Sequence, residues 1–526
     1  MNDDLERAKK YFLSGLQYFE NEIYLEAKIA FEKSLEICPN RVSGLVNLTA
    51  TLIKLKEYAD AKNICEKILK IASDTSEAWL NLGLISLEVH EFEVAIRNFD
   101  EALKITPDYP DALTNKGCAL QELGDKSEAL ALHERAIQLN PKLYAAWLNK
   151  GVLLNQLGRY EEAIQAYDQA LTIRPNHFQA LTNRGATLAE GLGRYHDALG
   201  LYQVALSIKK DYADAHWNES IARLAVGDFA RGWEKYEFRW LKTSSNFYKH
   251  SNIPPLLKFL DVEISGKKIL VWFEQGYGDA IQFCRFIQLF HDLGAVVYIE
   301  IPVALRDLFL SLSCCHIIDY GYAPTDFDYQ IPMLSLPAYF HVDLKSISQK
   351  YPYLHPTAGA INRWKEVLRL SVKTLNIGLC CSGNLKLDKR SGYKRPIPLH
   401  LFSELVDRAN CFLIQKDLTS NDQIFLNQNP KLHYLGDQIQ DFNDSAAIIE
   451  NLDLVISIDS ALAHLAGAMG KKTFVLLPSI PDWRWISDAG DSTWYPSAIL
   501  FKQVTAGNWG DVISKVQSKL LSEDFS

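Results

Sequence analysis

The sequence of 526 residues predicts a helical solenoid followed by an α/β region with two wound parallel sheets. Three observations predict this fold class. In the first half, four prolines are separated by 34 residues or by twice that number: Pro39, Pro107, Pro141 and Pro175. After about residue 265, short apolar runs of strand length replace the helical pattern, and glycine-containing turns join these runs to amphipathic helices. A chain of this length is expected to divide into several domains.

Two columns of residues repeat with the period of the prolines. The column of large residues is Tyr11, Leu45, Trp79, Leu113, Trp147 and Leu181, and four residues later the column of small residues is Gly15, Thr49, Gly83, Gly117, Gly151 and Gly185. Small residues of one helix that face bulky residues of its partner let the two backbones approach closely. The pattern resembles the tetratricopeptide repeat (TPR), a helix–turn–helix unit. We expect six units over residues 8–212 and a degenerate seventh, at about 213–245, as a terminal cap.

The predicted TPR solenoid, residues 1–245, has a consequence for binding. Stacked repeats form a concave surface that suits an extended peptide or a protein partner. The net charge of −9 and the pI near 5.9 argue against a nucleic-acid partner, because affinity for phosphates depends on clustered Lys and Arg. The sequence has no apolar run long enough for a transmembrane segment, and its acidic start lacks the apolar core of a secretory signal, so we expect a cytoplasmic protein.

The second half reads as a linker, two α/β halves and a final helix. The linker is predicted at 246–265, the halves at 266–356 and 374–505, and the C-terminal helix at 506–526. The predicted strands are 268–273, 295–301, 375–381, 411–414, 454–458 and 473–477, and the predicted helices include 280–290, 446–452 and 461–469. Strands that alternate with helices form parallel sheets covered by helices, and two such halves suggest a cleft between them.

Three turns at the carboxyl ends of predicted strands carry polar residues, and open α/β sheets bind ligands at such ends. The first turn contains Gly276, Gly278 and Asp279 and opens a helix. Two glycines before a helix let backbone amides face an anion. The alternative is a tight connection in which Asp279 is an acid favoured by the first helical turn.

The second turn is Ser382-Gly383-Asn384, followed by basic residues that include Lys389 and Arg390. A short loop of this kind with nearby cations suits a diphosphate, and the alternative is a solvated charged loop.

The third turn is Asp459-Ser460-Ala461, with His464 about one helical turn further on. Here the serine is placed to cap a helix whose amides can take a phosphate. The alternative for the histidine is an ordinary packed side chain.

A family resemblance rests on segments that recur in order over about 266–505. They are VWFEQGYGDAIQFCRF, DYQIPMLSLP, IGLCCSGN with RPIPL, DFNDSAAIIENLDLVISIDSALAHLAGAMGK, and VLLPSIPDWRW with WYPS. These segments resemble the bacterial TPR proteins that carry a glycosyltransferase domain similar to the family 9 heptosyltransferases. The resemblance implies a GT-B fold, in which two Rossmann-like domains face each other and the C-terminal one holds most of the donor.

The resemblance also implies roles for individual residues. Asp279 falls on the general base of that family, and Asp459, Ser460 and His464 match its donor-binding motif. Ala461 stands where the motif has a glycine, so nucleotide affinity or identity is expected to differ. Ser382, with Lys389 or Arg390, corresponds to the phosphate loop. Together with Gly276, Gly278, Gly383 and Asn384, these form the predicted donor site.

The predicted function is therefore transfer of a sugar from a nucleotide-diphosphate sugar to an acceptor hydroxyl. The resemblance implies an inverting reaction with no metal and no further cofactor, and a TPR array that recruits a protein acceptor or partner. The alternative is a non-catalytic TPR scaffold that keeps a degenerate transferase fold. A metal-dependent reaction would depend on Asp326 and Asp328, a DxD triplet. Trp483, Arg484 and Trp485 either stack on the ligand or anchor the packing of their loop.

Overall fold

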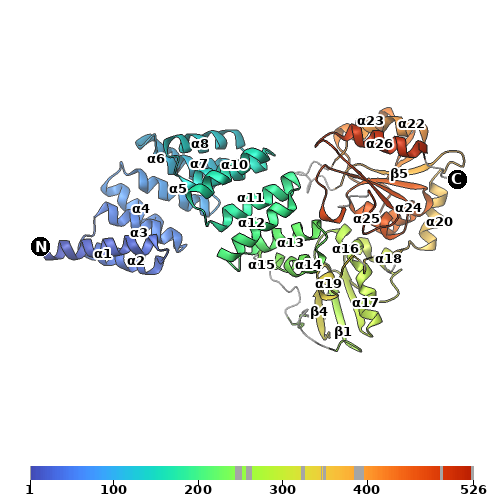
Figure 1. Ribbon diagram of the computed structural model, residues 1–526, viewed down its shortest axis with the longest axis horizontal. Coiled ribbons are helices and arrows are strands. Elements are labelled where there is room, and N and C mark those ends of the chain that lie inside the picture. Colours follow the sequence, from blue (N-terminus) through green and yellow to red (C-terminus); the bar gives the residue numbers. More distant parts are fainter. Residues whose placement is uncertain are drawn as a thin grey trace. The chain divides into compact units, whose positions relative to one another are not determined.

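The computed structural model, shown in Figure 1, consists of two compact units, Met1–Gly191 and Leu192–Ser526. The structure describes residues 2–242, 252–255, 263–321, 326–344, 346–347, 351–383, 396–485 and 490–522.

The first unit is a run of helical hairpins, which confirms the predicted solenoid (Figure 1). Its helices are α1 (Asn2–Glu20), α2 (Tyr24–Ile37), α3 (Val42–Lys54), α4 (Tyr58–Ile71), α5 (Ser76–Glu88), α6 (Phe92–Ile105), α7 (Pro110–Leu123), α8 (Lys126–Leu139), α9 (Tyr144–Gln156), α10 (Tyr160–Ile173), α11 (Phe178–Ala186) and the π-helical turn η1 (Thr187–Gly191). The sixth repeat has one residue more than the fifth, because Gly185 to Ala198 spans 13 residues and Gly151 to Ala163 spans 12. The extra residue is accommodated in η1, since a π-helical turn holds one more residue than an α-helical turn.

The small residues of the repeat face bulky residues of the partner helix. A Cβ atom added at Gly83 would lie 2.3 Å from Cε1 of Phe99, and one added at Gly151 would lie 2.5 Å from Cε1 of Tyr167. Thr49 takes the place of the glycine in the second repeat, and there the bulky partner is reduced to Cys65, which is fully buried. The two columns therefore vary together to keep the volume between the helices filled.

Ion pairs also recur at the repeat period. Lys116, at the start of one repeat, lies 2.8 Å from Asp100 in the preceding repeat. The equivalent pairs are Lys150–Glu134 at 2.9 Å and Arg184–Asp168 at 2.7 Å. Each of these cations thus connects one hairpin to the hairpin before it.

The solenoid was predicted to extend to residue 245, but the last helices belong to the second unit. These helices are α12 (Tyr195–Ile208), α13 (Ala213–Ala225), α14 (Phe229–Tyr236) and α15 (Arg239–Lys242). The physical reason lies in the aromatic face of α14. Trp233 packs 6.0 Å from the ring of Phe283 and 5.3 Å from that of Trp483, and Phe229 packs 6.1 Å from Trp494. Aromatic residues expected to cap the solenoid instead enter the core of the α/β unit.

The first sheet has four parallel strands in the order β3-β2-β1-β4. The strands are β1 (Lys268–Trp272), β2 (Val296–Ile301), β3 (His316–Asp319) and β4 (Tyr329–Pro332). The accompanying helices are α16 (Tyr277–Phe283), η2 (Cys284–Phe286), α17 (Ile287–Asp292), α18 (Val303–Phe309), η3 (Met333–Ser335) and α19 (Leu336–Tyr339). The predicted helix at 280–290 is thus divided by a 3-10 turn.

The second sheet has six parallel strands in the order β10-β9-β8-β5-β6-β7. The strands are β5 (Asn376–Cys380), β6 (Asn410–Leu413), β7 (Leu432–Tyr434), β8 (Leu454–Ile458), β9 (Thr473–Leu477) and β10 (Ala498–Lys502). Strands β5, β8 and β9 are buried along their whole length, as the continuous apolar runs of a parallel sheet require. This is the doubly wound order, and the chain reverses its winding direction between β5 and β8.

Helices cover the second sheet. They are α20 (Ala358–Val367), η4 (Leu399–Phe402), α22 (Ser403–Arg408), α23 (Ser420–Gln428), α24 (Phe442–Asn451), α25 (Ala461–Ala468), η5 (Trp483–Trp485) and α26 (Trp509–Ser522). Residues Trp509 and Val512 of α26 lie in the same buried cluster as Phe474 of β9, so the predicted C-terminal helix is part of this α/β half. Among the helices that the structure describes, none is both long and apolar enough to cross a membrane.

The predicted linker at 246–265 is structured where it is described. The backbone amide of Gln330 in β4 donates to the carbonyl oxygen of Pro254 at 2.9 Å, and its side-chain amide donates to that of Ile253 at 2.7 Å. Residues 252–255 therefore lie beside β4 and form one isolated parallel bridge with it, Pro255 to Gln330.

Candidate functional site

A cavity of about 840 Å³ in the second unit is lined by turns that follow β1, β5 and β8. The carboxyl ends of β5 and β8 flank the point where the second sheet reverses its winding, which is where such sheets bind ligands. All the predicted site residues that the structure describes line this cavity: Gly276, Gly278, Asp279, Ser382, Gly383, Asp459, Ser460, Ala461 and His464. Asn384, Lys389 and Arg390 lie outside the described residues.

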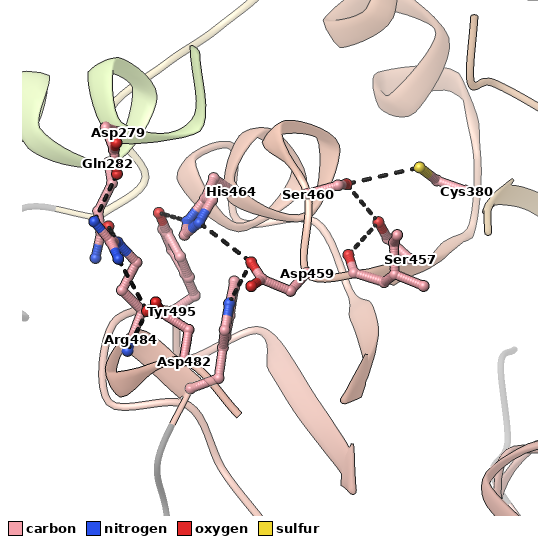
Figure 2. Close-up of polar contacts among 12 residues, drawn as sticks. Asp279, Gln282, Cys380, Ser457, Asp459, Ser460, His464, Asp482, Arg484 and Tyr495 are labelled. Carbon is pink, nitrogen blue, oxygen red and sulfur yellow. Dashed lines mark hydrogen bonds and ion pairs between the residues drawn. The ribbon is translucent and has the colours of Figure 1, made fainter. Parts of the chain in front are cut away.

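Asp279 and Arg484 form an ion pair that joins the two halves (Figure 2). Nη2 of Arg484 donates to Oδ1 of Asp279 at 2.6 Å, Nη1 donates to Asp482 at 2.9 Å, and Nε donates to Gln282 at 2.9 Å. Burial raises the pKa of the Asp279 carboxyl above its ordinary value, and the charge of Arg484 opposes that rise. Asp279 is thus a desolvated carboxylate in a fixed orientation.

The two glycines of the first turn have a packing reason for their identity. Gly276 has φ +66°, and a Cβ atom there would lie 2.9 Å from Oδ2 of Asp279. A Cβ atom at Gly278 would lie 3.0 Å from Cδ2 of His464, so this glycine permits the close approach of α16 to α25. Since α16 has only seven residues, the glycines are explained by the turn and the helix contact rather than by an anion site at the start of α16.

Asp459 and His464 are held by aromatic residues of the second half (Figure 2). The indole N–H of Trp485 donates to Oδ1 of Asp459 at 2.8 Å, and Nδ1 of His464 lies 2.9 Å from the hydroxyl of Tyr495. The His464 ring packs 4.9 Å from the Trp485 ring and is 4% exposed. His464 is therefore a packed side chain at the edge of the cavity, and its part in donor binding stays a prediction.

The tryptophans of the last loop are packing anchors. Trp485 packs against His464 and Tyr495, and Trp483 packs against Trp233 and Trp494. Both are buried, at 2% and 5% exposure. Trp483 and Arg484 also line the cavity, so the structure shows the packing of this loop and leaves its contact with a ligand as a prediction.

Helix α25 begins without a side-chain cap. Ser460 is its N-cap residue, but the Ser460 hydroxyl contacts the Ser457 hydroxyl at 2.9 Å and the Cys380 thiol at 3.6 Å instead of a first-turn amide (Figure 2). The next residues, Ala461 and Leu462, line the cavity. The N-terminus of α25 thus presents uncapped amides and the positive end of the helix dipole, a combination that attracts anions.

The loop after β5 is organised by Gln415, which the sequence pattern did not indicate. Its Oε1 accepts hydrogen bonds from the amides of Cys381 and Ser382 at 2.7 and 3.1 Å, and its Nε2 donates to the Ser382 hydroxyl at 2.5 Å. The Ser382 hydroxyl in turn donates to the carbonyl oxygen of Asp417 at 3.2 Å. The Ser382 hydroxyl is therefore already engaged. The sequence signal for Gln415 is its place two residues after the end of β6.

A further wall of the cavity comes from the α13–α14 hairpin, which contributes Trp217, Ile221 and Tyr236. The repeat pattern places this hairpin in the solenoid, so it does not indicate that these three side chains line the cavity.

The DxD triplet lies at the opposite edge of the first sheet. Asp326 and Asp328 neighbour the beginning of β1, where Lys268 contacts Asp326 at 2.5 Å and Lys267 contacts Asp328 at 3.2 Å. The triplet is thus away from the cavity and paired with lysines. Within the described ranges, no group of three or more His, Cys, Asp or Glu side chains is arranged to hold a metal ion.

Comparisons with known proteins identify the repeats. Tetratricopeptide-repeat family models match residues 74–142 and 114–178, so the chain contains TPR repeats. Protein FlbA of Caulobacter vibrioides is 23% identical over 344 residues, which span 60% of this chain and 56% of FlbA. The chain thus matches just over half the length of this curated relative.

Two solved structures are also similar. A tetratricopeptide repeat protein from Parabacteroides merdae is 16% identical, with 46% of this chain and 94% of that chain covered and a TM-score of 0.35. A thermophilic TPR protein of Thermus thermophilus, TTC0263, is 19% identical, with 34% and 98% covered and a TM-score of 0.33.

Proposed function

We propose that the second unit is a glycosyltransferase of the GT-B type that moves a sugar from a nucleotide-diphosphate sugar to an acceptor hydroxyl, and that the TPR array recruits a protein acceptor or partner. One observation carries the proposal. A single cavity gathers the turns after β1, β5 and β8, and with them Asp279 and the uncapped N-terminus of α25. The resemblance of the same three turns to family 9 transferases supports this assignment.

The chemistry that this geometry supports is an inverting displacement. The acceptor oxygen forms a bond to the anomeric carbon while the bond from that carbon to the diphosphate oxygen breaks. The acceptor proton goes to Asp279, and the diphosphate leaves with the electron pair. The amides at the start of α25 stabilise the charge that develops on the leaving group.

Arg484 has a specific part in this scheme. A carboxylate with a raised pKa is a better proton acceptor than an ordinary aspartate, but it must be ionised before the reaction. The guanidinium lowers the pKa that burial raises, and it occupies Oδ1 of Asp279. It thus favours the ionised form of Asp279 against the effect of burial and fixes the orientation of this carboxyl group.

The second candidate is a TPR scaffold with a degenerate transferase fold. It is favoured by the fact that Asp279, Ser382 and His464 all have hydrogen-bond partners within the protein. Side chains whose hydrogen bonds are all made within the protein are typical of residues that stabilise the fold.

The test measures turnover of a panel of nucleotide-diphosphate sugars by the full chain, and the signal is the nucleoside diphosphate released. Asp279→Asn should reduce transfer by at least about 100-fold, while its affinity for nucleoside diphosphate in calorimetry stays nearly unchanged. The matched control is Asp326→Asn, which removes an exposed carboxylate at the opposite edge of the sheet and should leave turnover intact.

Two results would contradict the proposal. If Asp279→Asn keeps turnover within about tenfold of the wild type, the role as base is wrong. If no nucleotide-sugar is turned over and no nucleoside diphosphate gives heat, the scaffold is the better account.

A further inference from the structure

The α13–α14 hairpin forms an apolar wall beside the proposed base. Trp217 and Ile221 of α13 are partly buried, and the Trp217 ring lies 4.9 Å from the ring of the buried Tyr236 in α14. Burial raises the pKa of the Tyr236 phenol, and the charges of Arg484 and Asp279 also act on that pKa. Tyr236, Trp217 and Ile221 line the same cavity as Asp279 and Arg484, and the ring contact joins Trp217 to Tyr236 in one apolar wall.

The wall is tied firmly to the turn that carries Asp279. Arg239 of α15 donates from Nε and Nη2 to the two carboxylate oxygens of Glu274, each at 3.0 Å. Glu274 also accepts from the amide of Leu334 at 3.0 Å. The Arg239 and Glu274 side chains are only 8% and 6% exposed. A bidentate buried pair of this kind fixes the hairpin and the β1–α16 turn in one arrangement.

Every Lys and Arg of the described segment 213–242 has a carboxylate partner. The pairs are Arg223–Glu219 at 2.5 Å, Arg231–Asp228 at 2.8 Å, Lys235–Glu219 at 3.4 Å, Arg239–Glu274 at 3.0 Å and Lys242–Asp214 at 3.0 Å. An anionic acceptor, such as a phosphorylated sugar or a phospholipid head group, gains little from cations that are already neutralised. The charge pattern therefore favours an uncharged acceptor segment on this wall.

We propose that this hairpin is the acceptor subsite, and that it takes a peptide segment whose Ser or Thr hydroxyl faces Asp279 while a neighbouring apolar side chain packs on Trp217 and Ile221. This inference rests on the proposed function. Aromatic and aliphatic surfaces of this kind anchor peptide side chains. Ile221 offers no hydrogen-bond partner to a saccharide hydroxyl, whereas an apolar peptide side chain gains from contact with it.

The experiment measures binding and transfer with the full chain and three probes: an array of synthetic peptides with a central Ser or Thr, neutral maltooligosaccharides, and phosphatidylglycerol vesicles. For peptides that bind, Trp217→Ala should raise KM at least about tenfold with little change in kcat, and Trp217→Phe should restore most of the affinity. Ile221→Ala should act in the same direction. Leu241→Ala, which removes an exposed apolar side chain of α15 outside the cavity lining, is its matched control.

Binding of nucleoside diphosphate separates failure of this inference from failure of the proposed function. If nucleoside diphosphate binds normally but Trp217→Ala leaves peptide KM unchanged, the subsite is wrong. Binding of maltooligosaccharides or vesicles in place of every peptide overturns the peptide assignment, as does the absence of any peptide that binds. If nucleoside diphosphate does not bind to the wild type either, the proposed function itself fails.

Discussion

The two units differ in how far apart along the chain their interacting residues lie. In the solenoid, Lys116 pairs with Asp100 across 16 residues, and the same kind of pair recurs in the following repeats. In the second unit, Arg484 pairs with Asp279 across 205 residues, and Arg285 donates to the carbonyl oxygen of Trp494 across 209. Local, repeated contacts leave a period in the sequence, whereas a site built from distant segments leaves none.

The first two predictions concern the solenoid and have the largest expected effects on stability. The first tests the packing between paired helices. Gly83→Thr places a side chain against Phe99 and should lower the free energy of unfolding by about 3 kcal/mol. The double variant Gly83→Thr/Phe99→Cys copies the natural pair Thr49 and Cys65 and should recover part of that loss. Urea unfolding of the full chain, followed by the helical circular dichroism signal, measures both. If the double variant is no more stable than the sum of the single changes predicts, the two columns do not compensate each other.

The second prediction concerns His133, the histidine in the column of bulky residues. It is fully buried, neither ring nitrogen has a hydrogen-bond partner among the described residues, and burial lowers its pKa to about 4. The unfolded chain binds a proton to this ring near pH 6.5, so stability should fall as the pH decreases from about 6.5 to about 4, by roughly 3 kcal/mol in total. His133→Phe, the residue type of Phe31 and Phe99, should remove this loss.

Urea unfolding at pH 7 and at pH 4.5 checks the prediction for His133. If His133→Phe loses as much stability between pH 7 and pH 4.5 as the wild type does, the buried His133 ring is not the source of the pH dependence.

The third prediction has the smallest expected effect and concerns the pair Asp279–Arg484, whose members lie far apart in the sequence. Because Arg484 lowers the pKa that burial raises in Asp279, Arg484→Gln should raise that pKa further. The proposed transfer needs the ionised carboxylate, so the acid limb of the pH profile of kcat/KM should move to higher pH. Arg484→Lys keeps a positive charge and should move it less. Acid limbs that coincide in the two variants would argue against control of Asp279 by this charge.

Much of the fold could be predicted because its signals are local. The apolar runs at 268–273 and 454–458 appear as β1 and β8, and the glycine column appears as the contact between paired helices. The end of the solenoid could not be predicted, since the aromatic residues Phe229 and Trp233 are suited equally to a cap or to another core. Their partners, Trp494 and Trp483, lie more than two hundred residues further along the chain.

The candidate site was predictable turn by turn, but its internal bonding was not. Each turn follows a buried strand, and a turn at the end of a parallel strand is a recognisable position for polar residues. Gln415 organises the Ser382 loop, and Trp217 lines the cavity. Both roles depend on side-chain contacts between elements that share no pattern in the sequence. These residues required the structure.

The central claim is that the cavity between the two sheets holds the diphosphate of the donor. Hydrogen–deuterium exchange of the full chain, with and without ADP, UDP, GDP, CDP and dTDP, tests it most directly. We predict that a nucleoside diphosphate that binds will slow exchange at the start of α25, in residues 460–464, and in the loop at 380–383, with little change in the solenoid. Protection confined to other segments, or none with any of the five, would contradict the account.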